Sequence, residues 1–555
     1  MLLRPFVGLV TLFVLSSALC SAEPEVIAHW PLQNGVEDIT GHTPKAEATA
    51  VKFEAIGPAG SQRTAARFDG EHSIIRVPNS PALKLGGDPF SVSAWVYTDG
   101  STTDVPGDIL SQYDPATRTG FHLGLYTHGG VTNSQSNSRQ LHFGIDQGQI
   151  EPDFTDHGRL GNAVYVFSLC VHQGKLYAST CHAGETEAGR VFRFEGGDKW
   201  TDLGSPDKAN AISAMATHNG ELYVASCKYR LSGSALSDSE NLNPGGSVFR
   251  LGADDKWVPC GKLSAETYSI ASLISFNGQL YAGSLYKPAE FYRYEGGEKW
   301  TPLATPNGKR VEALTVFNNG LYASCYDEGL VFRFDGKEWA HVGTIPNATQ
   351  TYGFSVHRGH LYVSEWPLAH VYKYLGGTSW EDVGRLGMEL ETMPLVVYNG
   401  KMYGGTLPLA EVYRYDEGTQ WTRVGRVDHT PDVKYRRAWS MAVYQGRLFV
   451  GALPSGRVLS IEAGRNATHD HELSAGWHHV AAVRGTDRLT LYVDGQQVSE
   501  SASLKPGEYN LNSEKPLEIG FGAQDYFHGG LSDLKVYRGA LSALQIEQLA
   551  KPAQP

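Results

Sequence analysis

Cysteine is scarce in this chain of 555 residues, which has six, and none of them lies at a metal-ligand spacing such as C-x-x-C. Five remain after Cys20, and this odd number leaves at least one unpaired within the chain. Cys181, Cys227 and Cys325 each closely follow a repeated tyrosine. We therefore predict no zinc site and no disulfide, and we expect the cysteines to fill small buried apolar positions.

Long apolar runs and an excess of basic residues are also missing. Beyond the N-terminus no stretch approaches about 18 apolar residues, so we predict no membrane span. The formal net charge is −12 and the pI is near 5.9. Because binding to phosphates needs clustered Lys and Arg, this balance argues against a nucleic-acid partner.

Known catalytic signatures are absent as well. The chain has no H-E-x-x-H zinc motif and no G-x-S-x-G nucleophile elbow. The Asp-box repeat of sialidase propellers does not occur either. We therefore predict no catalytic residues and favour a protein that is not an enzyme, although a hydrolase or lyase without a known signature stays open.

The first 22 residues have the pattern of a secretory signal peptide. Arg4 gives the positive start, an apolar run extends from about Val7 to Cys20, and small residues near Ala22 suit cleavage before Glu23. We predict residues 1–22 as a signal peptide and a secreted or periplasmic mature protein.

Aromatic and turn residues are abundant, with 28 Tyr, 11 Trp and 63 Gly, which favours an all-β protein. Between about residues 151 and 464, a tight turn before an apolar-aromatic pair recurs with 40 to 58 residues between successive aromatics. Asn-Gly, which four of the turns contain, is the strongest short hairpin signal. The turns lie at residues 173–174, 219–220, 277–278, 319–320, 358–359, 399–400 and 445–446.

A second hairpin follows each of the first six turns and ends on a tryptophan strand, so each unit holds four short strands, as a propeller blade does. The seventh unit lacks this strand, and Asp153–Gly161 resembles the strand segment Trp380–Gly387. We expect the N-terminal segment to complete the last blade and close the ring. The prediction is a seven-bladed β-propeller over residues 151–464, only loosely similar to kelch repeats. The six tryptophans are Trp200, Trp257, Trp300, Trp339, Trp380 and Trp421.

Segments on both sides of these repeats share another pattern. Four lie before residue 150, at Ala28–Leu32, Ala65–Gly70, Ile74–Pro78 and Phe90–Val96, and three lie after residue 465, at Gly476–Val483, Leu489–Gly495 and Leu531–Tyr537. Together they resemble the two halves of a laminin-G-like, concanavalin-like jelly roll. The resemblance implies one β-sandwich formed by residues 23–150 and 465–550, with the propeller inserted between its halves. It also implies a fold that often binds carbohydrate or protein ligands.

The candidate binding residues lie on one face of the predicted ring, where the loops between strands two and three meet the loops between blades. Glu365 and Trp366 form the most informative pair, because an indole stacks on sugar faces while a carboxylate accepts hydroxyl hydrogen bonds. Tyr286, Glu389, Glu391 and Tyr435 fall on the same face. The predicted binding set is Glu365, Trp366, His370, Tyr326, Asp327, Arg310 and Arg437.

Four histidines near the return to the sandwich, His469, His471, His478 and His479, invite a metal hypothesis. The jelly-roll resemblance makes Trp477–His479 a strand feature, and alternation places His478 and His479 on opposite faces. We predict no metal site and no cofactor. Relatives of this fold bind calcium at the rim, so Asp533 and Asp38 are positions to examine.

These observations lead to one hypothesis and two alternatives. The first is an exported binding protein that recognises carbohydrate or cell-surface ligands. The second is an enzyme, a hydrolase or lyase acting on polysaccharide at the propeller mouth. The third is a scaffold whose propeller docks a protein partner.

Overall fold

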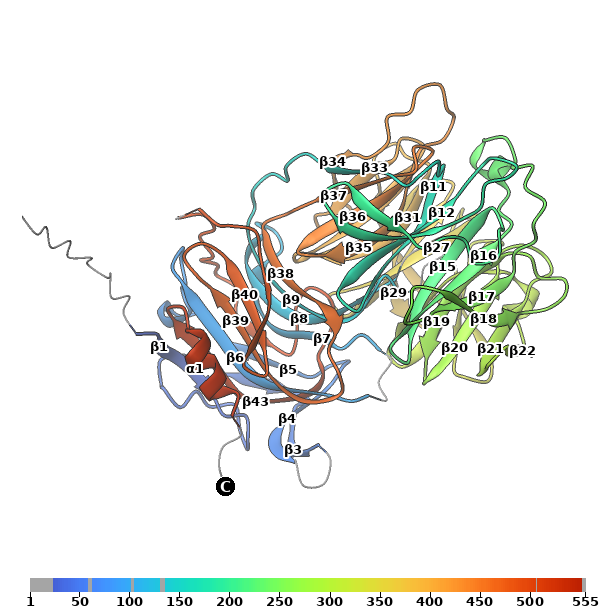
Figure 1. Ribbon diagram of the computed structural model, residues 1–555. Coiled ribbons are helices and arrows are strands. Elements are labelled where there is room, and N and C mark those ends of the chain that lie inside the picture. Colours follow the sequence, from blue (N-terminus) through green and yellow to red (C-terminus); the bar gives the residue numbers. More distant parts are fainter. Residues whose placement is uncertain (1–22, 58–61, 101–103, 130–134, 506, 552–555) are drawn as a thin grey trace, which may run out of the picture.

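The computed structural model describes residues 23–57, 62–100, 104–129, 135–505 and 507–551 (Figure 1). The predicted signal peptide lies outside the described residues. Strands make up 55% of the structure and helices 3%, so the prediction of an all-β protein is confirmed. In the described part of the chain, no helix is both long and apolar enough to cross a membrane.

The first sheet of the sandwich combines strands from both ends of the chain. Strand β43 pairs with β1, β4 and β6, and β39 pairs with β6, so segments from opposite ends of the chain lie side by side. Its order is β3 (Lys52–Ile56), β4 (Arg63–Asp69), β43 (His528–Arg538), β6 (Phe90–Thr98), β39 (Gly476–Arg484), β40 (Leu489–Val493) and β41 (Gln496–Glu500), with β1 (Glu25–Trp30) beside β43.

The second sheet is mixed in the same way, because β38 pairs with β9 and β42 pairs with β5 and β7. Between the two sheets lies one continuous apolar core that includes Trp30, Phe90, Phe143 and Leu491. The strand order of this second sheet is β2 (Glu47–Thr49), β5 (Ile74–Val77), β42 (Leu517–Ile519), β7 (Gly107–Asp114), β8 (Thr119–His128), β9 (Asn137–Gln147) and β38 (Arg465–Glu472). The short helix α1 (Ala543–Leu549) follows β43, and its N-terminus is held by a capping box between Ser542 and Gln545.

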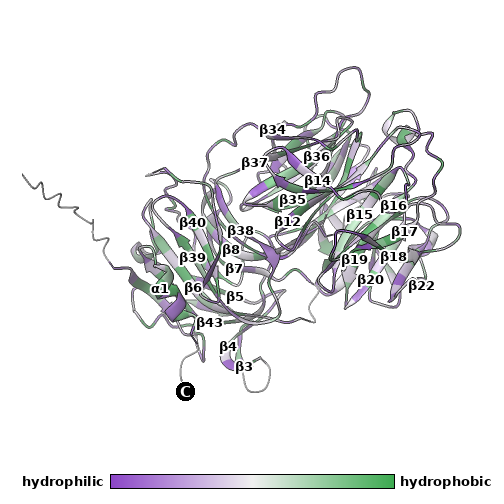
Figure 2. Ribbon diagram, in the orientation of Figure 1, coloured by the Kyte–Doolittle hydropathy of each residue, from purple (hydrophilic) through white to green (hydrophobic). Residues whose placement is uncertain are grey.

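Five four-stranded sheets stand as separate blades of the propeller. Hydrophobic residues gather on the strands of both the sandwich and the propeller (Figure 2). The blades are β19 (Ile270–Phe276), β20 (Gln279–Ser284), β21 (Phe291–Gly296) and β22 (Lys299–Leu303); β23 (Val311–Phe317), β24 (Gly320–Cys325), β25 (Leu330–Phe334) and β26 (Trp339–Thr344); β27 (Gln350–His357), β28 (His360–Trp366), β29 (His370–Gly376) and β30 (Ser379–Arg385); β31 (Glu391–Tyr398), β32 (Lys401–Leu407), β33 (Glu411–Tyr415) and β34 (Trp421–Arg426); and β35 (Arg437–Tyr444), β36 (Arg447–Leu453), β37 (Arg457–Ile461) and β10 (Thr155–Arg159).

The prediction of seven separate blades is therefore corrected to five. The other eight propeller strands form one continuous sheet, because Cys181 of β12 pairs with Ala211 of β15 and joins two successive four-stranded meanders. This sheet contains β11 (Tyr165–His172), β12 (Lys175–Cys181), β13 (Val191–Gly196), β14 (Lys199–Asp202), β15 (Ala211–His218), β16 (Glu221–Cys227), β17 (Ser247–Leu251) and β18 (Trp257–Lys262).

The ring closes where β10 pairs with β37, so the N-terminal segment completes the last blade as the sequence predicts. The inner strand β35 also packs beside β11, the first inner strand. The predicted tryptophans form hydrogen bonds between neighbouring sheets and meanders. The Trp200 indole N–H donates to the backbone carbonyl of His157 in β10, at 2.9 Å. The other five indoles make the equivalent bond to the preceding outer strand or the loop that follows it.

The predicted hairpin turns all lie at one end of the ring, and this end meets the sandwich. At the fifth turn, the backbone N–H groups of Arg358 and Gly359 donate to the carbonyls of Ala523 and Gln524. Asn399 takes up the left-handed conformation that a tight turn needs, with φ 42°, and its side chain reaches the sandwich strand β9. The opposite end of the ring is therefore the one free for a ligand.

Candidate functional site

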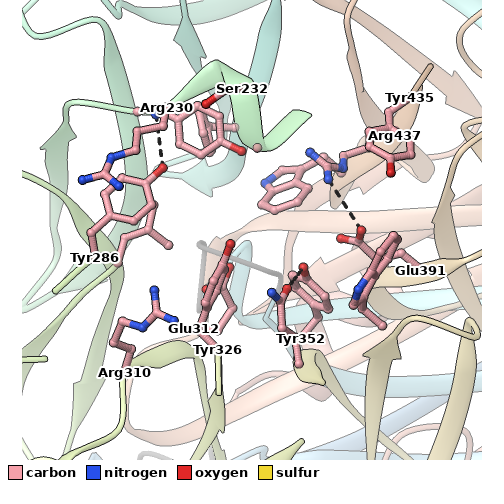
Figure 3. A pocket seen from close by; sticks show the side chains of 17 residues that line it. Arg230, Ser232, Tyr286, Arg310, Glu312, Tyr326, Tyr352, Glu391, Tyr435 and Arg437 are labelled. Atoms are coloured by element: carbon pink, nitrogen blue, oxygen red, sulfur yellow. Dashed lines mark hydrogen bonds and ion pairs between the residues drawn. The ribbon is translucent and has the colours of Figure 1, made fainter. Parts of the chain in front are cut away.

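A cavity of about 400 Å³ opens at the end of the ring away from the sandwich (Figure 3). It lies over the first residues of the inner strands and between the loops that follow second strands. Its walls are formed by Phe167, Tyr229, Arg230, Ser232, Gly233, Leu285, Tyr286, Arg310, Glu312, Tyr326, Gln350, Tyr352, Trp366, Glu391, Tyr435, Arg437 and Trp439. Its size is within the range of small-molecule sites.

The repeat itself places side chains in this cavity. Glu312, Tyr352, Trp439 and Phe167 each lie five residues before the last residue of an inner strand. Arg310, Gln350, Glu391 and Arg437 each lie seven residues before the last residue of an inner strand. Side chains two residues apart in a strand point to the same face, so both sets turn toward the axis of the ring. The two positions together supply eight of the cavity residues.

Glu312 is the most unusual of these residues. It is only 1% exposed, and among the described residues its Oε2 atom has no hydrogen-bond partner. Burial raises the pKa of the Glu312 carboxyl to about 8, against the opposing effect of Arg310. A buried carboxyl oxygen without a partner is costly, and Oε1 of Glu391 in the same cavity also has none among the described residues.

Glu391 and Arg437 form a buried ion pair on the neighbouring inner strands β31 and β35. Their Oε2 and Nη2 atoms are 3.5 Å apart, and Arg437 also donates through Nη1 to Ser234 Oγ at 2.5 Å. Burial raises the pKa of the Glu391 carboxyl, and Arg437 opposes that rise. The pair fixes one wall of the cavity and neutralises most of its own charge.

Two further arginines stack on tyrosine rings at the mouth. The Arg310 guanidinium lies 4.2 Å from the ring centre of Tyr326 and forms a two-point ion pair with Asp327, at 2.6 and 3.1 Å. Arg230 lies 4.7 Å from the ring centre of Tyr286, whose hydroxyl oxygen accepts the Arg230 backbone N–H at 3.1 Å. Ring faces at this mouth are thus already covered by the protein's own cations.

Aromatic rings form the remaining wall. Phe167 packs against Tyr229 with ring centres 4.8 Å apart, and Trp366 lies 6.5 Å from Tyr435. Trp366 remains partly exposed, so one aromatic surface borders the cavity and solvent together. Such amphipathic walls suit a ligand with both apolar faces and hydroxyl groups.

Four of the seven predicted binding residues line this cavity: Arg310, Tyr326, Trp366 and Arg437. Glu365 does not. Its side chain is buried and accepts the backbone N–H groups of Leu368 and His370, the latter at 2.7 Å, so it holds the loop instead.

The other two predicted residues also lie outside the cavity wall. Asp327 is turned to Arg310, as described above. His370 pairs with Asp382 at 2.9 Å on the outer part of its blade. Both have partners within the fold, and neither faces the cavity.

Sequence reasoning missed Glu312, Tyr352, Trp439 and Tyr229. The first three could have been found from the repeat, by aligning the inner strands on their last residues. Tyr229 lies at the start of the Ser- and Asn-rich loop after β16, where no repeat position marks it.

Neither calcium candidate has a free carboxylate. Asp38 accepts the backbone N–H of His29 at 2.9 Å and both the N–H and hydroxyl of Thr40. Asp533 binds His29 Nε2 at 2.7 Å and Lys535 at 2.8 Å. Within the described ranges, no three His, Cys, Asp or Glu residues are grouped as a metal site would need.

Of the four histidines near the sandwich return, His469 and His471 stack on each other, with ring centres 5.3 Å apart. His478 pairs with Asp494 at 2.7 Å, while His479 packs on Trp95 with ring centres 5.5 Å apart. The five cysteines after Cys20 are all buried.

Comparisons with known proteins support the sandwich in part. The profile of the Concanavalin A-like lectin/glucanases superfamily matches residues 428–547, a region that begins before β35 and ends in α1. A laminin-G-like domain is therefore present in the C-terminal part of the chain. No curated protein matches the chain in sequence.

Solved structures resemble the chain only weakly. A catalytically inactive virginiamycin B lyase from Staphylococcus aureus with quinupristin is 10% identical, with a TM-score of 0.45 over 56% of this chain and 99% of that one. The WD40 β-propeller domain of Doa1 is 12% identical, with a TM-score of 0.41 over 56% and 97%. YCF48 bound to D1 peptide is 12% identical, with a TM-score of 0.40 over 56% and 96%. Likeness at this level carries no functional argument.

Proposed function

We propose that this protein is an exported binding protein that takes a saccharide unit into the cavity at the propeller mouth. The observation that carries the proposal is the composition of that cavity. Aromatic rings form much of its wall, and a buried carboxyl, Glu312, offers an oxygen with no partner among the described residues. Rings stack on the apolar faces of sugars, and carboxyl groups exchange hydrogen bonds with their hydroxyls.

Two further features support the proposal. The matching superfamily is described by its lectins and glucanases, both of which are carbohydrate proteins. The pattern of residues 1–22 supports export, where extracellular glycans are met. In this proposal the cavity is the primary site, and the sandwich is a second contact for a long glycan.

Titration calorimetry of the purified protein against a panel of oligosaccharides tests the proposal. We expect Trp366→Ala to weaken binding at least tenfold, because about 1.4 kcal/mol of stacking is lost. Leu375→Ala is the control, since Leu375 is 56% exposed and lies outside the cavity wall. Saccharide binding that Trp366→Ala leaves unchanged would remove the propeller mouth as the site.

A polysaccharide-active enzyme is a second candidate, favoured by one observation. Glu312, with its pKa raised to about 8, is protonated near neutral pH, and Glu391 lines the same cavity. A protonated carboxyl beside a second one can serve as a general acid. Release of new reducing ends from a polysaccharide, lost in Glu312→Gln, would favour the enzyme. Binding without any release would favour the binding protein.

A further inference from the structure

The cations at the propeller mouth are not all balanced. Arg437 pairs with Glu391, and Arg310 pairs with Asp327. Arg230 has no ion pair with any carboxylate of the described residues. Its Nη2 atom donates to the hydroxyl of Tyr268 at 2.6 Å, and its side chain is exposed at the cavity rim (Figure 3). One cation therefore remains available to a ligand.

The remaining acidic group of the cavity does not cancel this charge. Glu312 lies at the base of the wall next to Arg310, and its raised pKa, about 8, keeps the carboxyl neutral at neutral pH. A neutral carboxyl also has a hydrogen to donate to an anionic oxygen. With both paired arginines compensated, Arg230 leaves the mouth with an excess of positive charge.

A cationic ligand is the natural alternative for a cavity rich in aromatic rings. Here, however, Arg230 and Arg310 already lie over Tyr286 and Tyr326. A second cation would have to displace these guanidinium groups or lie beside them, and like charges at that distance repel. The arrangement of charges thus disfavours a cation and favours an anion.

We infer that the saccharide bound at the propeller mouth carries an anionic group, a carboxylate or a sulfate, and that Arg230 receives it. This inference rests on the proposed saccharide-binding function. The planar guanidinium of Arg230 is held by the Tyr268 and Tyr286 side chains, so it needs little further ordering to bind an anion. The net charge of −12 argues against a general attraction of polyanions. Preferential binding of an anionic saccharide would therefore indicate a local site at the mouth.

Matched pairs of oligosaccharides test the inference in about 0.15 M salt, where exposed long-range charges are screened. Uronate oligomers are compared with their carboxyl-reduced forms, and sulfated galactan oligomers with their desulfated forms. We expect at least one anionic member to bind ten or more times tighter than its neutral partner, as one charge-assisted contact gives. The carboxylate pair and the sulfate pair distinguish the two sources of the anion.

The variant Arg230→Gln locates the effect. We expect it to reduce the ratio of anionic to neutral affinity to less than threefold. Arg488→Gln is the control, because Arg488 lies on a sandwich loop paired with Asp487 and Glu500. Equal binding of anionic and neutral partners, or a preference that survives Arg230→Gln, overturns the inference but leaves saccharide binding intact. If no oligosaccharide of either charge binds, the proposed function itself fails.

Discussion

The two ends of the propeller ring are built from the same repeats, yet their polar groups are satisfied in different ways. At the end that faces the sandwich, Asn399 donates to the carbonyls of Ile145 and Ala463 and lies 2.9 Å from His122 Nε2. At the open end, Glu312 Oε2 has no hydrogen-bond partner within the part of the chain that the structure describes. The protein itself supplies the partners of Asn399, although His128 Nε2 and His142 Nε2 at the same end also have none among the described residues.

The pKa shifts of two histidines at the covered end and of Glu312 at the open end also have opposite directions. At the covered end, burial lowers the pKa of His122 to about 4 and of His128 to about 3, so both are neutral. At the open end, burial raises the pKa of Glu312 to about 8. The neutral histidines therefore make the junction lose stability in acid, and Glu312 makes the mouth lose stability in base.

The largest effect is expected from breaking the covered end with Asn399→Ala. The change removes the donors of two buried carbonyls and the partner of His122, and each lost contact costs about 1 to 3 kcal/mol. We expect a loss of about 4 kcal/mol in the free energy of unfolding, measured as a lower thermal midpoint. Asn219→Ala is the matched control: Asn219 has φ 50°, like Asn399 at 42°, but it is exposed. Equal losses in the two variants would assign the effect to turn strain alone.

The next effect concerns the open end and the ionisation of Glu312. Its pKa is 4.5 in the unfolded chain and about 8 in the fold, so its contribution is full below pH 4.5 and is lost as pH rises through 8. Glu312→Gln cannot ionise, so we expect it to stabilise the protein at pH 8 by about 3 kcal/mol and to change little at pH 5. The titratable or charged groups near Glu312 are Cys227, Arg310, Cys325, Tyr326, Asp327, Tyr352, Glu391 and Arg437.

Thermal melting across pH 5 to 9 measures this difference. Glu338→Gln serves as the control, because Glu338 is exposed on an outer turn. A Glu312→Gln profile parallel to that of the unmodified protein would show that Glu312 is already ionised in the fold.

A smaller and opposite effect is expected at the covered end from His142→Phe. The His142 ring packs 4.8 Å from Tyr126, and burial, with His128 and His122, lowers its pKa well below 6.5. The unfolded chain takes up this proton as pH falls below 6.5 while the fold does not, so stability is lost on acidification. Phe keeps the ring and removes the proton site.

We expect His142→Phe to retain up to about 2 kcal/mol more stability than the unmodified protein at pH 5, compared with pH 7. Asp108 and Asp470, with pKa values near 6 and 7, act in the opposite direction and are unchanged in both proteins. The exposed His341→Phe is the control, measured by thermal melting at the two pH values. An unchanged acid response in His142→Phe would place the acid-sensitive groups elsewhere.

Much of the architecture could be predicted from the sequence because its signals are local. Tight turns with left-handed residues and a tryptophan strand that ends each of the first six units mark the propeller, and the sequence predicts that residues 153–161 complete the last blade. The number of separate blades was wrong. The pairing of Cys181 with Ala211 joins two meanders, and one bridge between strands leaves no trace in a repeat pattern.

The site was predicted less well, since it depends on which side of each strand faces the axis. Aromatic and charged residues in loops drew attention to Glu365, whereas only an alignment of the inner strands on their last residues would have singled out Glu312. Charge alone does not separate the two: both are buried, with 1% of each exposed. The difference lies in their partners, which only the folded loop supplies.

The smallest effect, from Glu365→Gln, tests that distinction directly. The carboxylate of Glu365 accepts the backbone N–H of His370 at 2.7 Å and that of Leu368 at 3.2 Å, and Gln can keep one oxygen acceptor there. We expect a loss of about 1 kcal/mol in stability from the weaker, uncharged hydrogen bonds. Saccharide affinity should stay within about twofold, because the side chain holds the loop without reaching the cavity. Calorimetric binding and melting are measured on the same preparation. A Glu365→Gln variant that melts normally but loses affinity would show that this carboxylate reaches the ligand, and the cavity wall would then have to extend past Trp366 into the loop.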